Sequence, residues 1–211
     1  MTDASRIGFL NRQYEEGTRL AAASDRLHLF PIGPTPTERY VVIFTCAGLV
    51  KSLRDGAIVE ACRFEVGIWF PSDYLRRASM PQVLYWLGPS NVFHPNIHGP
   101  QSAVCVGRLI PGTPLVDIVY QVYEMITWQK ARLDHALNGE AAAWARNNRQ
   151  LLPVDRRPLK RRTQENGVSA SQHESGTGQR VQLSALPSVS KNNASGLEPG
   201  RLLGLISQSE D

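Results

Sequence analysis

The chain has 211 residues, 42% of them hydrophobic, and a formal net charge of +4. This length suits one domain with an appendage, because roughly 150 residues bury about 70% of the unfolded chain's surface without disulfide or metal support. The small net charge argues against a nucleic-acid-binding protein, and no apolar run is long enough to cross a membrane. Three cysteines without paired spacing fit a reducing compartment, and no leader is recognisable at the N-terminus, so we expect a cytoplasmic protein.

The first half of the chain predicts one helix followed by strands. Apolar residues at helical spacing predict an amphipathic helix over residues 4–22. Segments rich in β-branched and aromatic residues predict strands at 40–46, 58–70 and 83–87, and a short strand or extended piece at 104–106. Alternation in the second strand places the following side chains on one face: Cys62, Phe64, Val66, Ile68 and Phe70.

The second half predicts two helices and a tail. Pro114 opens a stripe of apolar residues that predicts a helix to about Ala131, and an alanine-rich segment predicts another over 140–151. Helix, antiparallel strands and helices in this order indicate an α+β fold. We expect the domain to span residues 1–152 and residues 153–211 to be a disordered tail, because aromatic residues are absent after Trp144.

The motif of greatest chemical interest is His94-Pro95-Asn96, followed by Cys105. A cysteine can carry an acyl group as a thioester. An asparagine amide in a turn beside it can donate a hydrogen bond to the oxyanion that forms when the thioester is attacked. Such a pair has most of what acyl transfer from sulfur to an amine requires.

This arrangement resembles the active site of ubiquitin-conjugating enzymes, whose signature is His-Pro-Asn followed by the acceptor cysteine. Further segments resemble the family's motifs in the family's order, namely Phe70-Pro71-Ser72-Asp73-Tyr74, Pro81-Gln82-Val83 and Asp134-His135-Ala136-Leu137-Asn138-Gly139-Glu140-Ala141-Ala142. The resemblance covers residues 1–152 and implies an N-terminal helix, an antiparallel meander of about four strands, and C-terminal helices.

The resemblance also implies a function and its residues. Cys105 would accept a ubiquitin-like protein as a thioester from an activating enzyme and pass it to an amine of a protein substrate. Asn96 would stabilise the oxyanion or hold the loop beside the cysteine, and His94 and Pro95 would shape that loop. Asp134 would orient the incoming lysine and help it lose its proton, although a capping role is equally open. No cofactor or metal is implied.

Some features depart from the family's pattern. The spacing from Asn96 to Cys105 is one residue longer than usual, and Ile110-Pro111-Gly112-Thr113-Pro114 replaces the tryptophan and proline that usually follow the cysteine. These changes suggest a divergent member, similar to the bacterial ubiquitin-conjugating-like proteins encoded beside a ubiquitin-like protein, an activating enzyme and a metalloprotease. Such systems are associated with defence against phages.

Other interpretations remain open from the residues alone. The same fold can serve as a noncatalytic binding module for ubiquitin-like proteins. A Cys–His hydrolase would pair Cys105 with His98 or His135, and a zinc site would use His94, His98 and Cys105. The basic segment 156–162 is either a solvated linker or a weak contact for an anionic partner. Cys46 and Cys62 lie in predicted strands, where cysteine usually acts as a small buried hydrophobe.

Overall fold

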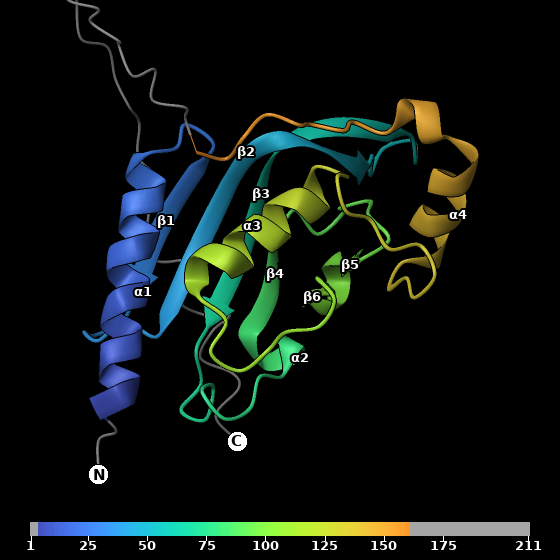
Figure 1. Ribbon diagram of the computed structural model, residues 1–211. Helices are drawn as coiled ribbons and strands as arrows, with labels where there is room; N and C mark the ends of the chain where they lie inside the picture. Colours follow the sequence, from blue (N-terminus) through green and yellow to red (C-terminus); the bar gives the residue numbers. More distant parts are fainter. Residues whose placement is uncertain (1–3, 161–211) are drawn as a thin grey trace, which may run out of the picture. The chain divides into compact units, whose positions relative to one another are not determined.

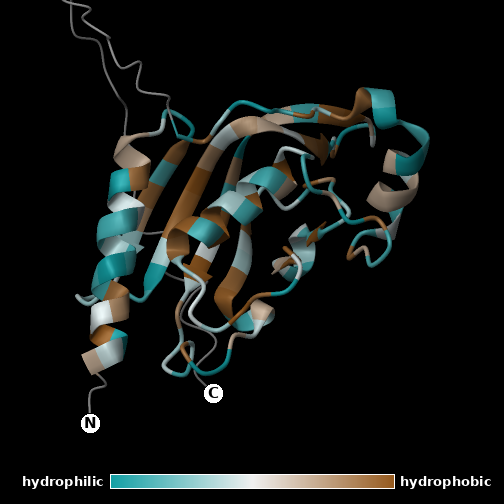
Figure 2. Cartoon of the chain, viewed as in Figure 1, coloured by the Kyte–Doolittle hydropathy of each residue, from teal (hydrophilic) through white to brown (hydrophobic). Residues whose placement is uncertain are grey.

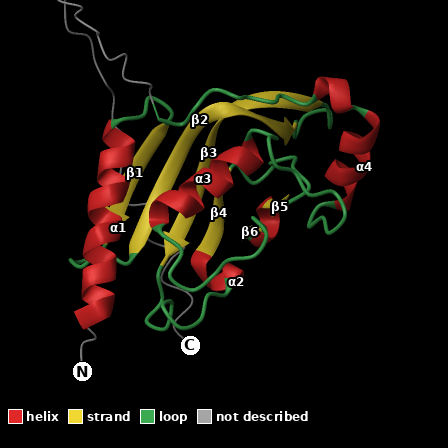
Figure 3. Ribbon diagram, in the orientation of Figure 1, coloured by secondary structure: helices red, strands yellow, loops and turns green. Residues whose placement is uncertain are grey.

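A computed structural model describes residues 4–160 of the chain. Helix α1 (Ala4–Ala22) is followed by strands β1 (Leu27–Ile32), β2 (Arg39–Lys51), β3 (Ile58–Trp69), the short helix α2 (Met80–Val83) and strand β4 (Leu84–Gly88). The two-residue strands β5 (Ile97–His98) and β6 (Ala103–Val104) flank the 3-10 turn η1 (Gly99–Gln101). Helix α3 (Leu115–Ile126), helix α4 (Gly139–Asn147) and the 3-10 turn η2 (Arg149–Leu151) come last (Figures 1 and 3).

The four long strands form one antiparallel meander in the order β1-β2-β3-β4. Helix α3 lies across this sheet and α1 stands beside β1 (Figure 1). The main core lies where the sheet meets these helices. The ribbon of the middle strands is largely brown in Figure 2, which marks hydrophobic residues. Buried Gln13 joins the two helices, because its Oε1 accepts a hydrogen bond of 2.7 Å from the N–H of Leu115, the first residue of α3.

The architecture confirms the predicted α+β class, with an N-terminal helix, a four-stranded meander and later helices. The first helix has the predicted bounds, because its apolar spacing is regular. The identity of the fourth sheet strand differs from the prediction. The missed strand is β1, an edge strand that contains Pro31, and proline weakens a strand signal. Residues 103–104 pair instead with β5 in a separate small sheet.

The prediction that Cys62 points into the core is wrong. Phe64, Val66 and Ile68 are buried as predicted, but Cys62 is exposed. The register between β2 and β3 shifts between Thr45 and Gly48, so two residues of β2 lie opposite Cys62 alone. This bulge interrupts the alternation that the sequence implied.

The two C-terminal helices are shorter than predicted. Helix α3 ends at Ile126, and the Thr127 hydroxyl donates a hydrogen bond of 2.7 Å back to the carbonyl of Tyr123. Trp128 then adopts a positive φ of 58° and turns the chain away from the helix axis. Its indole packs on the ring of His94, with 4.5 Å between the ring centroids.

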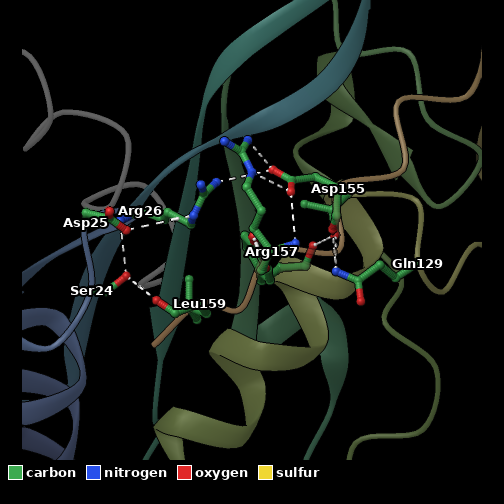
Figure 4. Close-up of polar contacts among 9 residues, drawn as sticks. Ser24, Asp25, Arg26, Gln129, Asp155, Arg157 and Leu159 are labelled. Carbon is green, nitrogen blue, oxygen red and sulfur yellow. Dashed lines mark hydrogen bonds and ion pairs between the residues drawn. The ribbon is translucent and has the colours of Figure 1, made fainter. Parts of the chain in front are cut away.

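Residues 153–160 pack against the domain, although the sequence assigned them to the tail (Figure 4). Leu159 is 1% exposed and belongs to the main core. Asp155 is buried and accepts two hydrogen bonds from the Arg157 guanidinium, of 2.7 and 2.6 Å, and one of 3.2 Å from Arg26. The Arg157 hydrogen bonds hold the pKa of Asp155 below its usual value. The packed chain therefore continues past the predicted boundary at residue 152. Residues 161–211 of the expected tail lie outside the described residues.

Within residues 4–160, the longest helices are too polar or too short to cross a lipid bilayer.

Candidate functional site

The site begins with the buried turn formed by His94, Pro95 and Asn96, between β4 and β5. His94 Nδ1 accepts a hydrogen bond of 3.1 Å from the N–H of Asn96, which fixes the turn. The ring is 2% exposed, and burial lowers the pKa of His94 to about 3. Its imidazole is therefore neutral at physiological pH and positions the loop, as the sequence suggested for this residue.

The side-chain amide of Asn96 holds a second loop, which follows α3. Its Nδ2 donates a hydrogen bond of 2.9 Å to the carbonyl of Arg132, and its Oδ1 accepts one of 2.8 Å from the N–H of the same residue. The Pro95 carbonyl adds a bond of 3.0 Å from the N–H of Asn138. Hydrogen bonds thus join the turn to the loop 129–138 at two places, Arg132 and Asn138. These hydrogen bonds are the kind that a loop-holding role of Asn96 requires.

Cys105 follows β6 directly and lies against this tied pair of loops. Its N–H donates a hydrogen bond of 2.9 Å to the carbonyl of Asn96. The residue is partly exposed, and it lines a cavity of about 230 Å³. The other lining residues come from the turn, from the chain after Cys105, from α3 and from the following loop: Asn96, Val106, Gln121, Glu124, Met125, Lys130, Ala131 and Arg132. The partly exposed Cys105 therefore shares a cavity with Asn96, as the sequence motif suggested.

The other cysteines differ from Cys105 in their surroundings. Burial, reinforced by the charge of Asp155, raises the pKa of Cys46 to about 12, so this thiol stays protonated at neutral pH. Cys62 is exposed on β3, outside the cavity. Among the three thiols, Cys105 is the one that combines access with a cavity and a fixed polar loop.

Asp134 is exposed on the loop 129–138 and is not among the residues that line the cavity. The carboxylate inside the cavity is Glu124, on the last turn of α3. It forms an ion pair of 2.6 Å with Lys130, and the side chains are 28% and 70% exposed respectively. Asp134 therefore lies on the loop beside the thiol, while Glu124 lies in the cavity itself.

The histidines needed for a Cys–His hydrolase do not line the Cys105 cavity. His98 Nδ1 caps the turn η1 by accepting a hydrogen bond from the N–H of Gln101. His98 also lines a different groove, of about 880 Å³, beside Lys51 and Glu140. His135 is exposed on the loop. Within residues 4–160, no three side chains of the metal-ligating types converge on one point.

Comparison with known proteins gives likenesses to solved structures and no sequence match. No family model matches the chain, and no curated protein matches it. Among solved structures, the E2 domain of a ubiquitin conjugating enzyme from Toxoplasma gondii is similar to this chain. The identity is 16%, the match covers 68% of this chain and 90% of that one, and the TM-score is 0.44.

Sequence reasoning missed three charged residues of the cavity: Glu124, Lys130 and Arg132. One signal was available, because Asp117, Gln121 and Glu124 are polar residues at helical spacing in an otherwise apolar helix. Lys130 and Arg132 lie in an irregular loop, where no periodic pattern marks them. The hydrogen bonds between Asn96 and Arg132 and the residues that line the cavity show that this loop is part of the site.

Proposed function

We propose that this protein conjugates a ubiquitin-like protein to amines. Cys105 accepts the C-terminal acyl group of the ubiquitin-like protein from an activating enzyme, and transfers it to an amine of a protein substrate. The observation that carries this proposal is the cavity beside Cys105, where a partly exposed thiol meets Asn96 of the His-Pro-Asn turn.

The reaction consists of two acyl transfers at the same carbonyl carbon. In loading, the thiolate of Cys105 attacks the thioester of the activating enzyme. The new C–S bond forms, and the enzyme's own thiolate leaves. In transfer, the nitrogen of a substrate amine attacks the Cys105 thioester, a C–N bond forms, the C–S bond breaks, and the nitrogen loses its proton to water. No redox partner or metal is needed.

The loop 129–138 contributes to the transfer step in this proposal. Asp134 is exposed on that loop, and its carboxylate attracts the ammonium form of an approaching lysine. His94 stays neutral and buried, so it holds the loop and does not exchange protons with the substrate.

The resemblance to the bacterial members of the family extends this proposal to a role in defence against phages. In such a system the ubiquitin-like protein and the activating enzyme would be encoded beside this chain. A noncatalytic binding module of the same fold is the competing function, and it requires no reactive cysteine.

The test is thioester formation with the cognate ubiquitin-like protein, the activating enzyme and ATP. We expect a mass shift on gel electrophoresis that is lost when a reducing thiol is added. Cys62→Ala should retain the shift, since that thiol lies outside the cavity, and Cys105→Ala should lose it. Binding without a covalent shift would favour the noncatalytic module instead.

A further inference from the structure

Each polar atom of the Asn96 amide makes a hydrogen bond to the main chain of Arg132. Nδ2 donates to the Arg132 carbonyl and Oδ1 accepts from the Arg132 N–H, and the residue Asn96 is 1% exposed. Nδ2 keeps a second N–H, so these bonds do not by themselves decide which group donates to an oxyanion on Cys105. They do hold Arg132 at the same cavity, and its guanidinium is a second donor that carries a positive charge.

The guanidinium of Arg132 lies beside the chain that carries Cys105. Gly107, two residues after Cys105, has a positive φ of 103°. A Cβ atom at this position would lie 3.1 Å from both Cζ and Nη2 of Arg132. The absence of a side chain at Gly107 thus allows the guanidinium to lie close to the main chain there.

The charges that line the cavity leave Arg132 as an available cation. Glu124 is paired with Lys130 at 2.6 Å. Among the described residues, no carboxylate lies within ion-pair distance of Arg132, and Arg132 lines the cavity together with Cys105. A cavity with one paired and one unpaired cation favours negative charge at the thiol.

We infer that Arg132 is a catalytic residue for the transfer step and that Asn96 is the residue that positions it. This inference rests on the function proposed above. As the amine nitrogen attacks the thioester carbon, the electron pair of the C=O bond moves to oxygen. When the C–S bond then breaks, the charge moves to sulfur. The guanidinium, with its fork of N–H donors, stabilises both anions, and the attacking nitrogen loses its proton to water.

The experiment uses a small chemical acyl donor, so that it needs no activating enzyme. The full chain carrying Cys62→Ser is treated with the mercaptoethanesulfonate thioester of acetyl-glycyl-glycine, which acylates Cys105 by thiol exchange. Excess donor is removed, free lysine is added, and loss of the acyl group is followed by mass spectrometry. The variants are Arg132→Gln, Arg132→Lys, Arg132→Ala and, as a control, Arg108→Gln. Arg108 is an exposed arginine near the thiol that does not line the cavity.

We expect Arg132→Gln to slow transfer to lysine by about tenfold or more, in the range seen when a transition-state donor is removed. Arg132→Lys should retain part of the rate, because lysine keeps the charge and loses the planar fork. Arg108→Gln should transfer at the parent rate. Addition of ethylguanidinium should restore part of the rate to Arg132→Ala, which a merely structural arginine would not allow.

A double-mutant cycle separates positioning from direct action. If Asn96 acts through Arg132, then Asn96→Ala slows the parent protein but slows Arg132→Gln no further. Multiplicative losses, or an Arg132→Gln variant with the parent rate, would overturn the inference. The proposed function fails by a different result, namely that the acylated parent protein transfers to lysine no faster than a cysteine peptide bearing the same acyl group.

Discussion

The side chain of Asn96 and the main chain of Arg132, two residues that line the Cys105 cavity, form a closed pair of hydrogen bonds of 2.9 and 2.8 Å. The pair joins a buried turn between β4 and β5 to a loop that follows α3. The loop that carries Lys130, Arg132 and Asp134 is therefore held at its middle by this asparagine, and near its end by the bond from the Asn138 N–H to the Pro95 carbonyl. This anchoring gives Asn96 effects on both stability and chemistry.

Replacing Asn96 by alanine should lower the free energy of unfolding by about 1–3 kcal/mol, because the N–H and the carbonyl of Arg132 lose their partly buried hydrogen bonds to the Asn96 amide. Urea unfolding measures the loss, and amide hydrogen exchange should show that the Arg132 N–H is no longer protected. Asn147→Ala is the matched control, since Asn147 is exposed at the end of α4. An unchanged unfolding midpoint for Asn96→Ala would contradict the role of this residue as an anchor.

Truncation should distinguish the packed segment from the rest of the C-terminal region. A chain that ends at Val154 loses Leu159 from the core and leaves Arg26 without Asp155. We expect a loss of about 3 kcal/mol or more, which corresponds to a fall in melting temperature of about 6–12 °C.

A chain that ends at Lys160 keeps both contacts and should melt close to the full-length protein. Calorimetry on the two truncated chains makes the comparison. Equal melting temperatures for both would show that residues 155–160 contribute nothing to stability.

Stability should also depend on pH through His94. Burial lowers the pKa of His94 to about 3, while the unfolded chain binds a proton at the ordinary value of 6.5. The unfolded state therefore binds more protons between these two values, and the native state loses stability as the pH falls from 6.5 toward 3. The contribution is about 1.4 kcal/mol per pH unit in this window.

Urea unfolding at pH 6.0 and pH 4.5 measures this slope. His94→Gln should flatten the slope between these pH values, whatever it does to absolute stability. If the slope is the same in both proteins, the imidazole titrates normally in the folded state.

Features that depend on residues close together in the chain could be predicted from the sequence, and features that depend on contacts between distant segments could not. The bounds of α1 follow from apolar spacing within the helix, and they agree with the prediction. The exposure of Cys62 could not be predicted, because it depends on a register shift against β2. Strand β1 was not predicted because it is a short edge strand whose Pro31 weakens the strand signal in the sequence.

The candidate site likewise has residues that the sequence predicted and residues that it did not. His94, Asn96 and Cys105 form a recognisable motif, and the structure brings Asn96 and Cys105 to one cavity. Glu124, Lys130 and Arg132 reach that cavity from a helix end and an irregular loop, so their positions depend on tertiary packing. Leu159 belongs to the core for a similar reason, since the polar composition around it gives no sign of burial.

The role of Asp134 can be tested with two nucleophiles of different charge. Asp134→Asn should slow discharge of acylated Cys105 to lysine about tenfold, because the side chain at this position no longer attracts the ammonium form of lysine. Discharge to hydroxylamine, which is neutral at pH 7, should change little. Glu60→Gln provides the control, since Glu60 is exposed on β3 and outside the cavity. Equal slowing with both nucleophiles would assign Asp134 a structural role.

Changing the Cys105 sulfur to oxygen tests whether this residue carries the acyl group. In the presence of the ubiquitin-like protein, the activating enzyme and ATP, Cys105→Ser should form an oxygen ester in place of a thioester. This adduct should survive a reducing thiol and be cleaved by mild alkali, whereas the adduct of the parent protein should be cleaved by both. An adduct of Cys105→Ser that a reducing thiol still cleaves would mean that another cysteine carries the acyl group, and would contradict the proposed role of Cys105.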